Sequence, residues 1–361
     1  MDPLARRLAD TTLALCRVPS VTGDERLLAD ELERRLRALP DVHVQRVGES
    51  VIADIGDGPV IALFGHSDTV RPADDQPLGI EGDRLYGCGA SDMKGGLAVM
   101  LELLAEASRG EHRGVRLRCV FYDKEEGPAD ESGLIRLLAA PAPVDADVVL
   151  ALCLEPTDNR IEAGCVGGLH ARVTVPGRRA HSARPWQGKN ALHAAAELLG
   201  ALRDRERREV VIDGLTFYEV LSATQASTEN SRNVVPDRFV INLNFRFAPG
   251  RPSASAIEEL QTFVTAHAPG ATVDIIDVAQ SGAVRLDQPA LQMWMTAQQL
   301  TVAAKQAWTD VARLTSRGIA AVNFGPGETA QAHQARESIS IAALAVHHEA
   351  MRALLHTVAH P

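Results

Sequence analysis

The stretch Val60-Ile-Ala-Leu-Phe-Gly-His-Ser-Asp68 holds the pattern from which both the fold and the chemistry of this chain can be argued. The run from Val60 to Phe64 is continuously apolar, which is typical of a strand buried on both faces of a sheet. His66 and Asp68 follow it directly. Because they are two residues apart in an extended segment, their side chains point to the same side. The stretch therefore predicts a buried strand that ends in two functional groups.

Helix and strand patterns alternate around this strand. A capping-box pattern at Thr22–Glu25 predicts the start of a helix with a leucine face. A further helix is predicted for residues 95–107, and strands for residues 115–122, 147–154 and 320–324. This alternation predicts an α/β domain with a mixed, largely parallel sheet flanked by helices.

The middle of the chain has a different order of elements. Strands are predicted for residues 169–175, 215–226, 234–247 and 272–278, and helices for residues 190–207 and 253–267. The order β-α-β-β-α-β is typical of a ferredoxin-like α+β domain. With 361 residues, the chain is long enough for two domains. We therefore expect residues 169–280 to be inserted between the two parts, 1–168 and 281–361, of the larger domain, with hinges at the glycines beside these boundaries.

Polar side chains gather at the ends of the predicted elements of the larger domain. They are His66 and Asp68 after the first strand, Asp92 before the helix 95–107, Glu125 and Glu126 after the strand 115–122, Glu155 after the strand 147–154, and His333 after the strand 320–324. An open α/β sheet binds ligands beyond the carboxyl ends of its strands. Imidazole and carboxylate ligands suit zinc, with cobalt or manganese as substitutes. The joint placement predicts a metal site, and a carboxylate could bridge two ions.

Each of these residues also has an ordinary interpretation. A single H-x-D is common by chance, an E-E pair is usually a solvated loop, and Asp92 could be only a helix N-cap. Only their combination predicts a site. Within it, Asp68 could accept a hydrogen bond from the ring nitrogen of His66 that does not bind metal. One carboxylate of Glu125–Glu126 could bind metal while the other acts as a base.

Composition excludes several other classes of protein. The formal net charge of -10 argues against a nucleic-acid partner. No apolar run approaches the roughly 18 residues of a membrane span. The five cysteines form no C-x-x-C pair, which predicts reduced thiols in a cytoplasmic protein. Asp2-Pro3 is typical of a helix start, so no signal peptide is expected.

These motifs resemble those of the co-catalytic zinc aminoacylases and exopeptidases. The matching segments are Gly65-His-Ser-Asp-Thr69, Tyr86-Gly-Cys-Gly-Ala-Ser-Asp-Met-Lys-Gly-Gly96, Asp123-Lys-Glu-Glu-Gly127, Leu154-Glu-Pro156 and Gly177-Arg-Arg-Ala-His181. The resemblance extends over nearly the whole chain. It implies a zinc-exopeptidase-like larger domain, two divalent metal ions, and an inserted domain that acts as a lid and forms a homodimer.

The resemblance also implies a role for each candidate residue. His66, Asp92 and Glu155 would bind one zinc ion, and Asp92, Glu126 and His333 would bind the other, where cobalt or manganese could replace zinc. Glu125 would be the general base, and Asp68 the partner of His66. His193 would reach the active site of the partner subunit, although its Ala- and Leu-rich helix equally predicts packing. Substrate carboxylates would be held by Arg184, Asn233 and Arg246, the last of which could equally lie on a strand surface.

The segments Asn233–Pro236, Asn242–Phe247 and Asn323–His333 resemble the branch of the family that acts on N-succinyl-LL-2,6-diaminopimelate in bacterial lysine biosynthesis. The segment Thr309-Asp-Val-Ala-Arg313 departs from the commoner Thr-Ser-Asp-Ala-Arg, which concerns substrate contacts and not the metal site. One alternative is another deacylase or exopeptidase of the family, for instance one that acts on acetylornithine. A second is a non-catalytic metal- or ligand-binding protein, against which Glu125 argues because a carrier needs no base.

Overall fold

The computed structural model describes residues 2–360, which divide into two compact units. Unit 1 consists of the chain up to Ala163, Arg285–Ala303, and the chain from Thr309 onward. Unit 2 consists of Gly164–Val284 and Ala304–Trp308. The insertion predicted at 169–280 lies within unit 2, which is longer at both ends. The sequence pattern does not assign Ala304–Trp308 to it, because that placement depends on the Gln306 side chain, which donates to Thr216 O and accepts from Tyr218 N.

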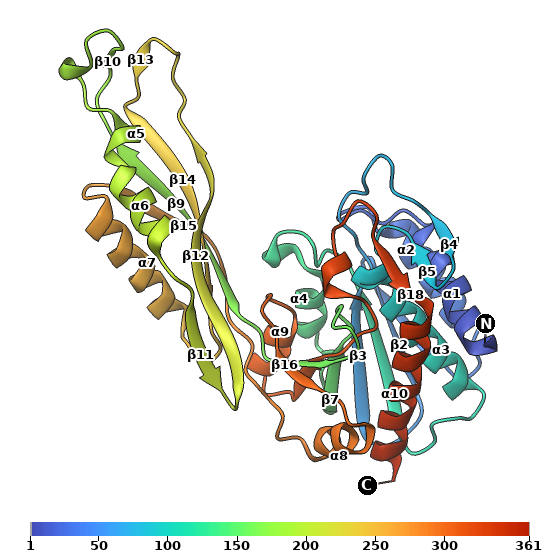
Figure 1. The fold of residues 1–361 in the computed structure, drawn as a ribbon. Helices are drawn as coiled ribbons and strands as arrows, with labels where there is room; N and C mark the ends of the chain where they lie inside the picture. The colour runs from blue at the N-terminus through green and yellow to red at the C-terminus, as the bar shows by residue number, and fades with distance from the viewer. Residues whose placement is uncertain (1, 361) are drawn as a thin grey trace. The chain divides into compact units, whose positions relative to one another are not determined.

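Unit 1 is built on an eight-stranded mixed sheet (Figure 1). Its strands, in spatial order, are β1 (His43–Val47), β2 (Ser50–Ile55), β6 (Arg116–Tyr122), β3 (Val60–His66), β7 (Val148–Cys153), β17 (Ala321–Asn323), β8 (Ile161–Ala163) and β16 (Val302–Ala304). The central strands β6, β3, β7 and β17 run parallel. Every residue of β3 is buried, as its continuous apolar run predicts.

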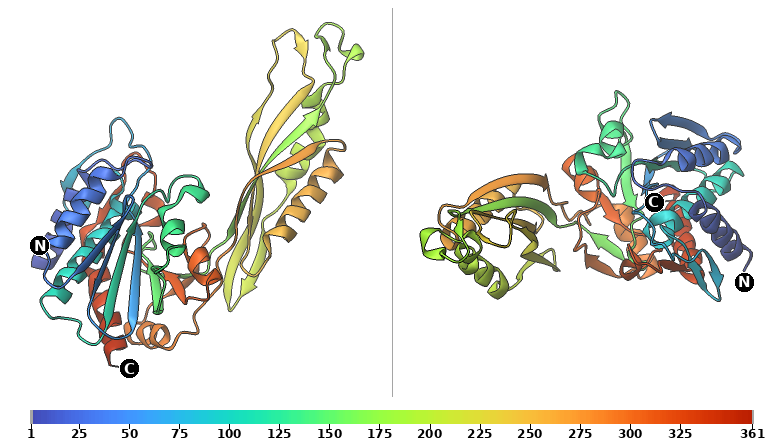
Figure 2. Two further views of the ribbon diagram at one scale, coloured as in Figure 1. Left: turned by 180° about the vertical axis from the view of Figure 1, so that it is seen from behind. Right: turned by 90° about the horizontal axis from the view of Figure 1, so that it is seen from above.

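Helices cover both faces of this sheet (Figure 2). They are α1 (Pro3–Cys16), α2 (Arg26–Arg37), α3 (Gly95–Ser108), α4 (Gly133–Leu138), α8 (Pro289–Gln298), α9 (Val311–Ser316) and α10 (Ile341–Ala359), with short helical turns η1 (Ala90–Lys94), η2 (Ala129–Glu131) and η4 (Thr329–Gln331). Leucines of α4 and α9 pack on Phe64 and Tyr122 of the sheet. Helices α1, α3 and α10 pack against one another in a second layer. A three-stranded sheet of β18 (Ser338–Ser340), β5 (Arg84–Tyr86) and β4 (Gly79–Glu81) completes the unit.

The N-termini of the first two helices differ in how well the sequence predicts them. Asp2 caps α1 by accepting from the backbone N–H groups of Leu4 and Ala5, as expected. The capping box predicted at Thr22–Glu25 is wrong, because α2 begins at Arg26 without a side-chain cap. The Glu25 carboxylate accepts instead from Gly23 N, and the Thr22 hydroxyl donates to Asp68. A tertiary partner has replaced the local one.

Unit 2 contains a five-stranded antiparallel sheet with helices on one face (Figure 1). The strands, in spatial order, are β11 (Arg208–Ile212), β12 (Leu215–Ser227), β14 (Arg238–Phe247), β9 (Gly167–Pro176) and β15 (Thr272–Ala279). The helices are α5 (Ala191–Ala194), α6 (Ala196–Asp204) and α7 (Ser253–His267), and a two-stranded ribbon joins β10 (Ala180–His181) to β13 (Val234–Val235) beside the turn η3 (Pro185–Gln187). Without β11, the order of the strands is the ferredoxin-like one that the sequence predicts.

Strand β11 is an addition that the sequence analysis does not predict. The helix predicted for residues 190–207 breaks into α5 and α6 and ends at Asp204, and β11 follows. Its hairpin with β12 turns at Asp213-Gly214, where both residues have positive φ. Asp-Gly between two strands is a strong hairpin signal, so a local pattern could have revealed β11.

The described residues contain five free cysteines, which agrees with the predicted reduced thiols. Within residues 2–360, no helix combines the length and apolar composition that are needed to cross a bilayer.

Candidate active site

Three neighbouring parallel strands of unit 1 end at one edge of the sheet and bring the predicted residues together. His66 is the last residue of β3, Glu125 and Glu126 follow β6, and Glu155 follows β7. Because adjacent parallel strands present their carboxyl ends together, residues that are distant in sequence meet there. Asp92 reaches the same edge from η1, and His333 from the loop before β18.

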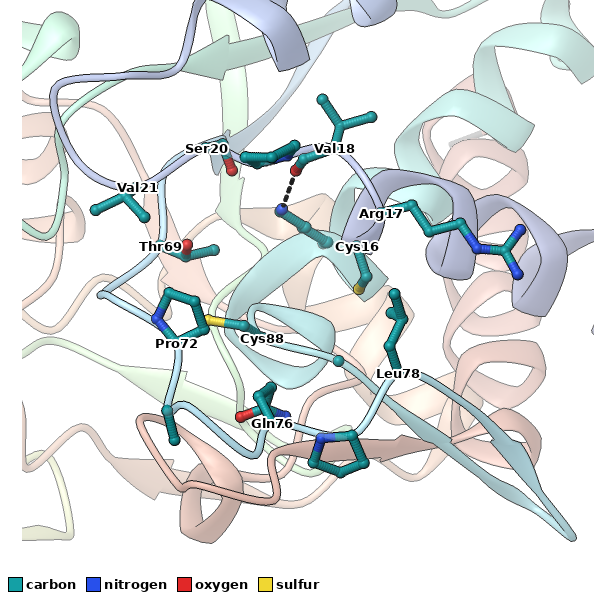
Figure 3. A pocket seen from close by; sticks show the side chains of 15 residues that line it. Cys16, Arg17, Val18, Ser20, Val21, Thr69, Pro72, Gln76, Leu78 and Cys88 are labelled. Carbon is teal, nitrogen blue, oxygen red and sulfur yellow. Dashed lines mark hydrogen bonds between the residues drawn. The ribbon is translucent and has the colours of Figure 1, made fainter.

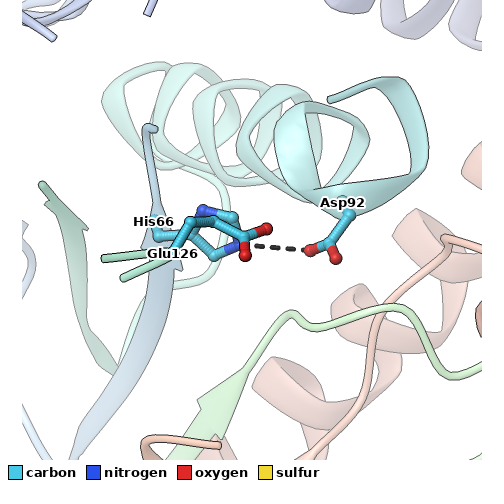
Figure 4. A group of neighbouring side chains, drawn as sticks. All are labelled: His66, Asp92 and Glu126. Atoms are coloured by element: carbon cyan, nitrogen blue, oxygen red, sulfur yellow. Dashed lines mark hydrogen bonds and ion pairs between the residues drawn. The ribbon is translucent and has the colours of Figure 1, made fainter. Parts of the chain in front are cut away.

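His66, Asp92 and Glu126 form the centre of this group of residues (Figure 4). One ligand atom from each lies within 4.8 Å of the other two. His66 Nε2 is 3.1 Å from Asp92 Oδ1, and His66 is almost fully buried. An imidazole nitrogen and two carboxylates at this spacing can converge on one cation.

His333 extends the group on the other side of Asp92. Its Nε2 is 2.7 Å from Glu126 Oε1 and 3.7 Å from Asp92 Oδ2. Asp92 thus directs one carboxylate oxygen toward His66 and the other toward His333. This is the arrangement that a bridging carboxylate between two cations requires.

The electrostatics of the group favour positive charge. Burial alone would lower the pKa of His66, but its contacts with Asp68 and Asp92 raise that pKa well above the ordinary value. The hydrogen bond with Glu126 raises the pKa of His333 to about 9. Two histidines surrounded by an excess of carboxylates form a site that attracts cations. The donor set of nitrogen and oxygen atoms fits zinc, and also cobalt or manganese.

Glu125 lies beside this group with a perturbed acidity. Burial, and next the neighbouring Glu155, raise the pKa of Glu125 well above that of an ordinary glutamate. Glu155 is buried, with 7% of its surface exposed. A carboxylate whose pKa is raised by burial and by a neighbouring carboxylate is suited to proton transfer.

The carboxylate of Asp68 faces His66 and also binds backbone groups that the sequence does not predict. His66 Nδ1 lies 3.0 Å from the main-chain oxygen of Asp68 and 3.6 Å from its Oδ1. The carboxylate itself accepts from Glu125 N at 2.9 Å and from Glu126 N at 3.0 Å. Asp68 therefore holds the backbone of the Glu125–Glu126 pair, and it contacts His66 through both its main-chain oxygen and its carboxylate.

Glu337 is a residue of the site region that the sequence analysis does not single out. It is buried, and its carboxylate accepts from the backbone N–H groups of Gly89, Ser91 and Asp92. Burial raises the pKa of Glu337 to about 7 against the lowering effect of these three donors. Its only local signal is an acidic residue directly before a short buried strand, four positions after His333.

The segment Thr309–Arg313, which departs from the family pattern, forms the start of α9. Asp310 is fully buried and pairs with Arg313, whose Nη2 donates to Ala129 O. Asp310 also contributes to the raised pKa of Glu125. With this order of residues, Arg313 still binds the loop that follows β6.

A cavity of about 290 Å³ lies between the end of α1 and the loop after β3 (Figure 3). Cys16, Cys88 and Leu78 contribute to its mostly apolar lining, together with the buried Lys94. Lys94 Nζ donates to the carbonyl oxygens of Leu15 and Val18, which satisfies the end of α1. None of the metal-ligand candidates lines this cavity, so it is separate from the group around Asp92.

A second group of potential ligands, Glu106, Glu111 and His112, lies at the end of α3. His112 Nε2 is 2.9 Å from Glu106 Oε2, and Arg352 Nη2 is 3.3 Å from Glu111 Oε2. His348 also contacts Glu106. Because Arg352 already supplies a positive charge beside Glu106 and Glu111, this group is a structural ion-pair cluster.

The candidates in unit 2 fall into two places. Arg184, His193 and Asn233 are exposed at the end that carries the β10–β13 ribbon, where Ser182 N donates to Asn233 O and Ala191 N to Pro236 O. Among residues 2–360, none forms a hydrogen bond or ion pair with these three side chains. Arg246 lies eight positions along β14 from Arg238, or roughly 26 Å in an extended strand. Within unit 2, therefore, Arg246 is apart from the other three.

Comparisons with known proteins identify relatives that are metal-dependent hydrolases by family or by name. The model of peptidase family M20/M25/M40 matches residues 62–357. A putative succinyl-diaminopimelate desuccinylase of Mycobacterium tuberculosis is 39% identical, covering 92% of this chain and 93% of that protein. A succinyl-diaminopimelate desuccinylase of Corynebacterium glutamicum is 37% identical, covering 94% and 92%.

Solved structures share the fold over the whole length. A tripeptidase from Staphylococcus aureus has a TM-score of 0.81 at 19% identity and covers 99% of both chains. A Bacillus subtilis protein described as a dinuclear metal-binding peptidase of the M20 family has a TM-score of 0.69 at 18% identity and covers 97% of both chains.

Proposed function

This chain belongs to peptidase family M20/M25/M40, and from that premise we propose that it is a two-metal hydrolase of N-succinyl-LL-2,6-diaminopimelate. One observation carries the proposal: the two carboxylate oxygens of Asp92 face His66 and His333. Glu125 lies beside this group. The products are succinate and LL-2,6-diaminopimelate. The names of the relatives at 37–39% identity support this choice of substrate. We place the reaction in bacterial lysine biosynthesis in the cytoplasm, which the free thiols support.

The residues present fit two divalent cations. His66, Asp92 and Glu155 would hold one, and Asp92, Glu126 and His333 would hold the other, with zinc as the proposed metal and cobalt or manganese as substitutes in the second position. The raised pKa values of both histidines support the assignment, because they report a local excess of negative charge. Bound divalent ions of this kind act as Lewis acids and make hydroxide available at neutral pH.

Glu125 carries out the proton transfers in the proposed reaction. It accepts a proton from the attacking water, whose oxygen bonds to the carbonyl carbon of the succinyl amide. It then delivers that proton to the nitrogen as the carbon–nitrogen bond breaks, which releases succinate and the free amine. The raised pKa of Glu125 supports this role, since a more basic carboxylate takes a proton from water more readily and holds it until the amine leaves.

Unit 2 supplies substrate contacts and a dimer interface in this proposal. His193 of the partner subunit donates to the developing oxyanion, and Arg184, Asn233 and Arg246 hold substrate carboxylates. The exposed and unpartnered side chains of Arg184, His193 and Asn233 support a role that needs contacts from outside unit 2. Trp186, with 74% of its surface exposed, and Leu192, with 43%, lie beside them, as at a surface that another subunit covers.

The test compares substrates and metal content in one preparation. Metal-depleted protein should be inactive, and adding zinc should restore hydrolysis of N-succinyl-LL-2,6-diaminopimelate. The same protein should hydrolyse N-acetylornithine much more slowly. Faster hydrolysis of N-acetylornithine would assign the chain to another activity of the family, and absence of hydrolysis of both compounds with zinc bound would contradict an enzymatic role.

A further inference from the structure

We propose that Glu337 is a positioning residue that fixes the direction of Asp92. Its carboxylate lies in the turn that leads into η1 and accepts from Gly89 N at 2.8 Å, Ser91 N at 2.8 Å and Asp92 N at 2.9 Å. Glu337 Oε1 receives two of these bonds and Oε2 the third. The inference rests on the proposed metal-dependent function, although its first test does not require metal.

The turn from Gly89 to Asp92 is shaped to receive an anion. Successive backbone N–H groups around a left-handed residue form a concavity that binds negative charge. Gly89 supplies that residue, with φ of 79°. A Cβ atom at Gly89 would lie 2.5 Å from Thr69 Cγ2, so a larger residue would be both strained and crowded. The Glu337 carboxylate occupies the concavity and leaves its three donors satisfied.

The same segment of chain that carries Glu337 also carries His333, one of the proposed metal ligands. Gly87 N donates to the main-chain oxygen of Glu337, and Ser91 Oγ donates to Glu328 O. The segment Glu328–Glu337 is therefore fastened to the turn before Asp92 at several points. Glu337 sets the two segments in register, so that His333 and the Asp92 carboxylate face each other.

A carboxylate suits this position better than any other side chain. It accepts only, and its two oxygens offer lone pairs for all three N–H donors. Glutamine has the same shape but one acceptor oxygen, and its NH₂ group would face at least one backbone N–H. Glu337→Gln therefore removes bonds to the turn while it changes the volume of the buried side chain very little.

The first test uses metal-free protein and measures backbone hydrogen exchange in a peptide that spans residues 86–94. In wild-type protein the amides of Gly89, Ser91 and Asp92 should be protected, and in Glu337→Gln they should exchange at least roughly ten-fold faster. The matched control is Glu328→Gln, because Glu328 lies in the same segment but its carboxylate pairs with Arg84. Wild-type amides that exchange at the rate of surface amides would overturn the proposal, even if the variant failed to fold.

The second test measures zinc affinity by competition with a chelating dye, together with kcat and KM. Residues that orient metal ligands typically change metal affinity or activity by about 10–100-fold. We expect Glu337→Gln to lose affinity for both ions in that range and to lower kcat with little change in KM, while Glu328→Gln behaves as wild type. Wild-type affinity in Glu337→Gln would refute the positioning role and leave the proposed function intact. A wild-type protein that binds zinc but hydrolyses nothing would contradict the function alone.

Discussion

The candidate functional residues of unit 1 and those of unit 2 are held in different ways. In unit 1, the backbone of Glu125–Glu126 donates to Asp68, and the backbone around Asp92 donates to Glu337. In unit 2, the side chains of Arg184, His193 and Asn233 are exposed, and residues 2–360 offer them no hydrogen-bond partner. The geometry of the metal-ligand candidates is thus set by hydrogen bonds inside one unit, whereas the described residues form no such bonds to these three side chains of unit 2.

The largest expected effect comes from Glu125→Ala. Removing the general base should lower kcat by roughly 100–10,000-fold, because water then attacks without proton transfer to a positioned group. Metal content, measured by atomic absorption, should stay close to that of wild type. Glu131→Ala, on an exposed residue of the same loop, is the control. Activity retained in Glu125→Ala would remove it from the catalytic role.

The next effect tests whether unit 2 acts across a dimer. His193→Ala should lower kcat by roughly 100–1,000-fold, as for other oxyanion donors, and should leave zinc affinity unchanged. If His193 acts on the partner's site, mixing the inactive variants His193→Ala and Glu125→Ala should restore about a quarter of wild-type activity through hybrid dimers. A mixture that stays inactive, although mass spectrometry detects hybrid dimers, would place His193 on its own subunit or outside the reaction.

A smaller effect is expected for Asp68→Asn. Glu125 N and Glu126 N donate to different oxygens of Asp68, and asparagine would turn an NH₂ group toward one of them, so the loop that holds both glutamates should loosen. We expect a loss of about 10–100-fold in zinc affinity or kcat. Asp74→Asn, at an exposed position of the loop after β3, should have no such effect. If both variants had the zinc affinity and kcat of wild type, the hydrogen bonds from Asp68 to the loop backbone would not be what holds the site of unit 1.

The smallest effect concerns the stability of unit 2. Burial alone would raise the pKa of Glu259, but Arg251 and Arg205 lower it to about 2. Because the folded pKa lies below the ordinary value, the stabilisation is present above pH 4.5 and is lost as the pH falls toward 2. Glu259→Gln should cost roughly 1 kcal/mol at pH 7, after allowance for solvent screening. Urea denaturation should show a lower free energy of unfolding for Glu259→Gln than for wild type at pH 7, and almost no difference at pH 2. The control Glu258→Gln, at an exposed neighbouring position, should unfold as wild type does at both pH values.

Much of the architecture follows from local patterns. The apolar run Val60–Phe64 predicts the buried strand β3, and the element order of residues 169–280 predicts the ferredoxin-like arrangement. The break between α5 and α6 and the capping of α2 are not predicted correctly. Glu25 and Thr22 have the spacing of a capping box, but the Thr22 hydroxyl donates to Asp68 and to Thr69 O, and Glu25 accepts from Gly23 N.

The sequence by itself determined that polar side chains stand at the ends of buried parallel strands, because the apolar runs and the residues after them are local features. It could therefore place His66, Asp92, Glu126 and His333 in one region. Only the tertiary structure decided how that region is held, since Glu337 lies 245 positions from the Asp92 backbone that it binds. Hydrogen bonds between segments so far apart depend on the packing of the whole unit, and no local pattern specifies them.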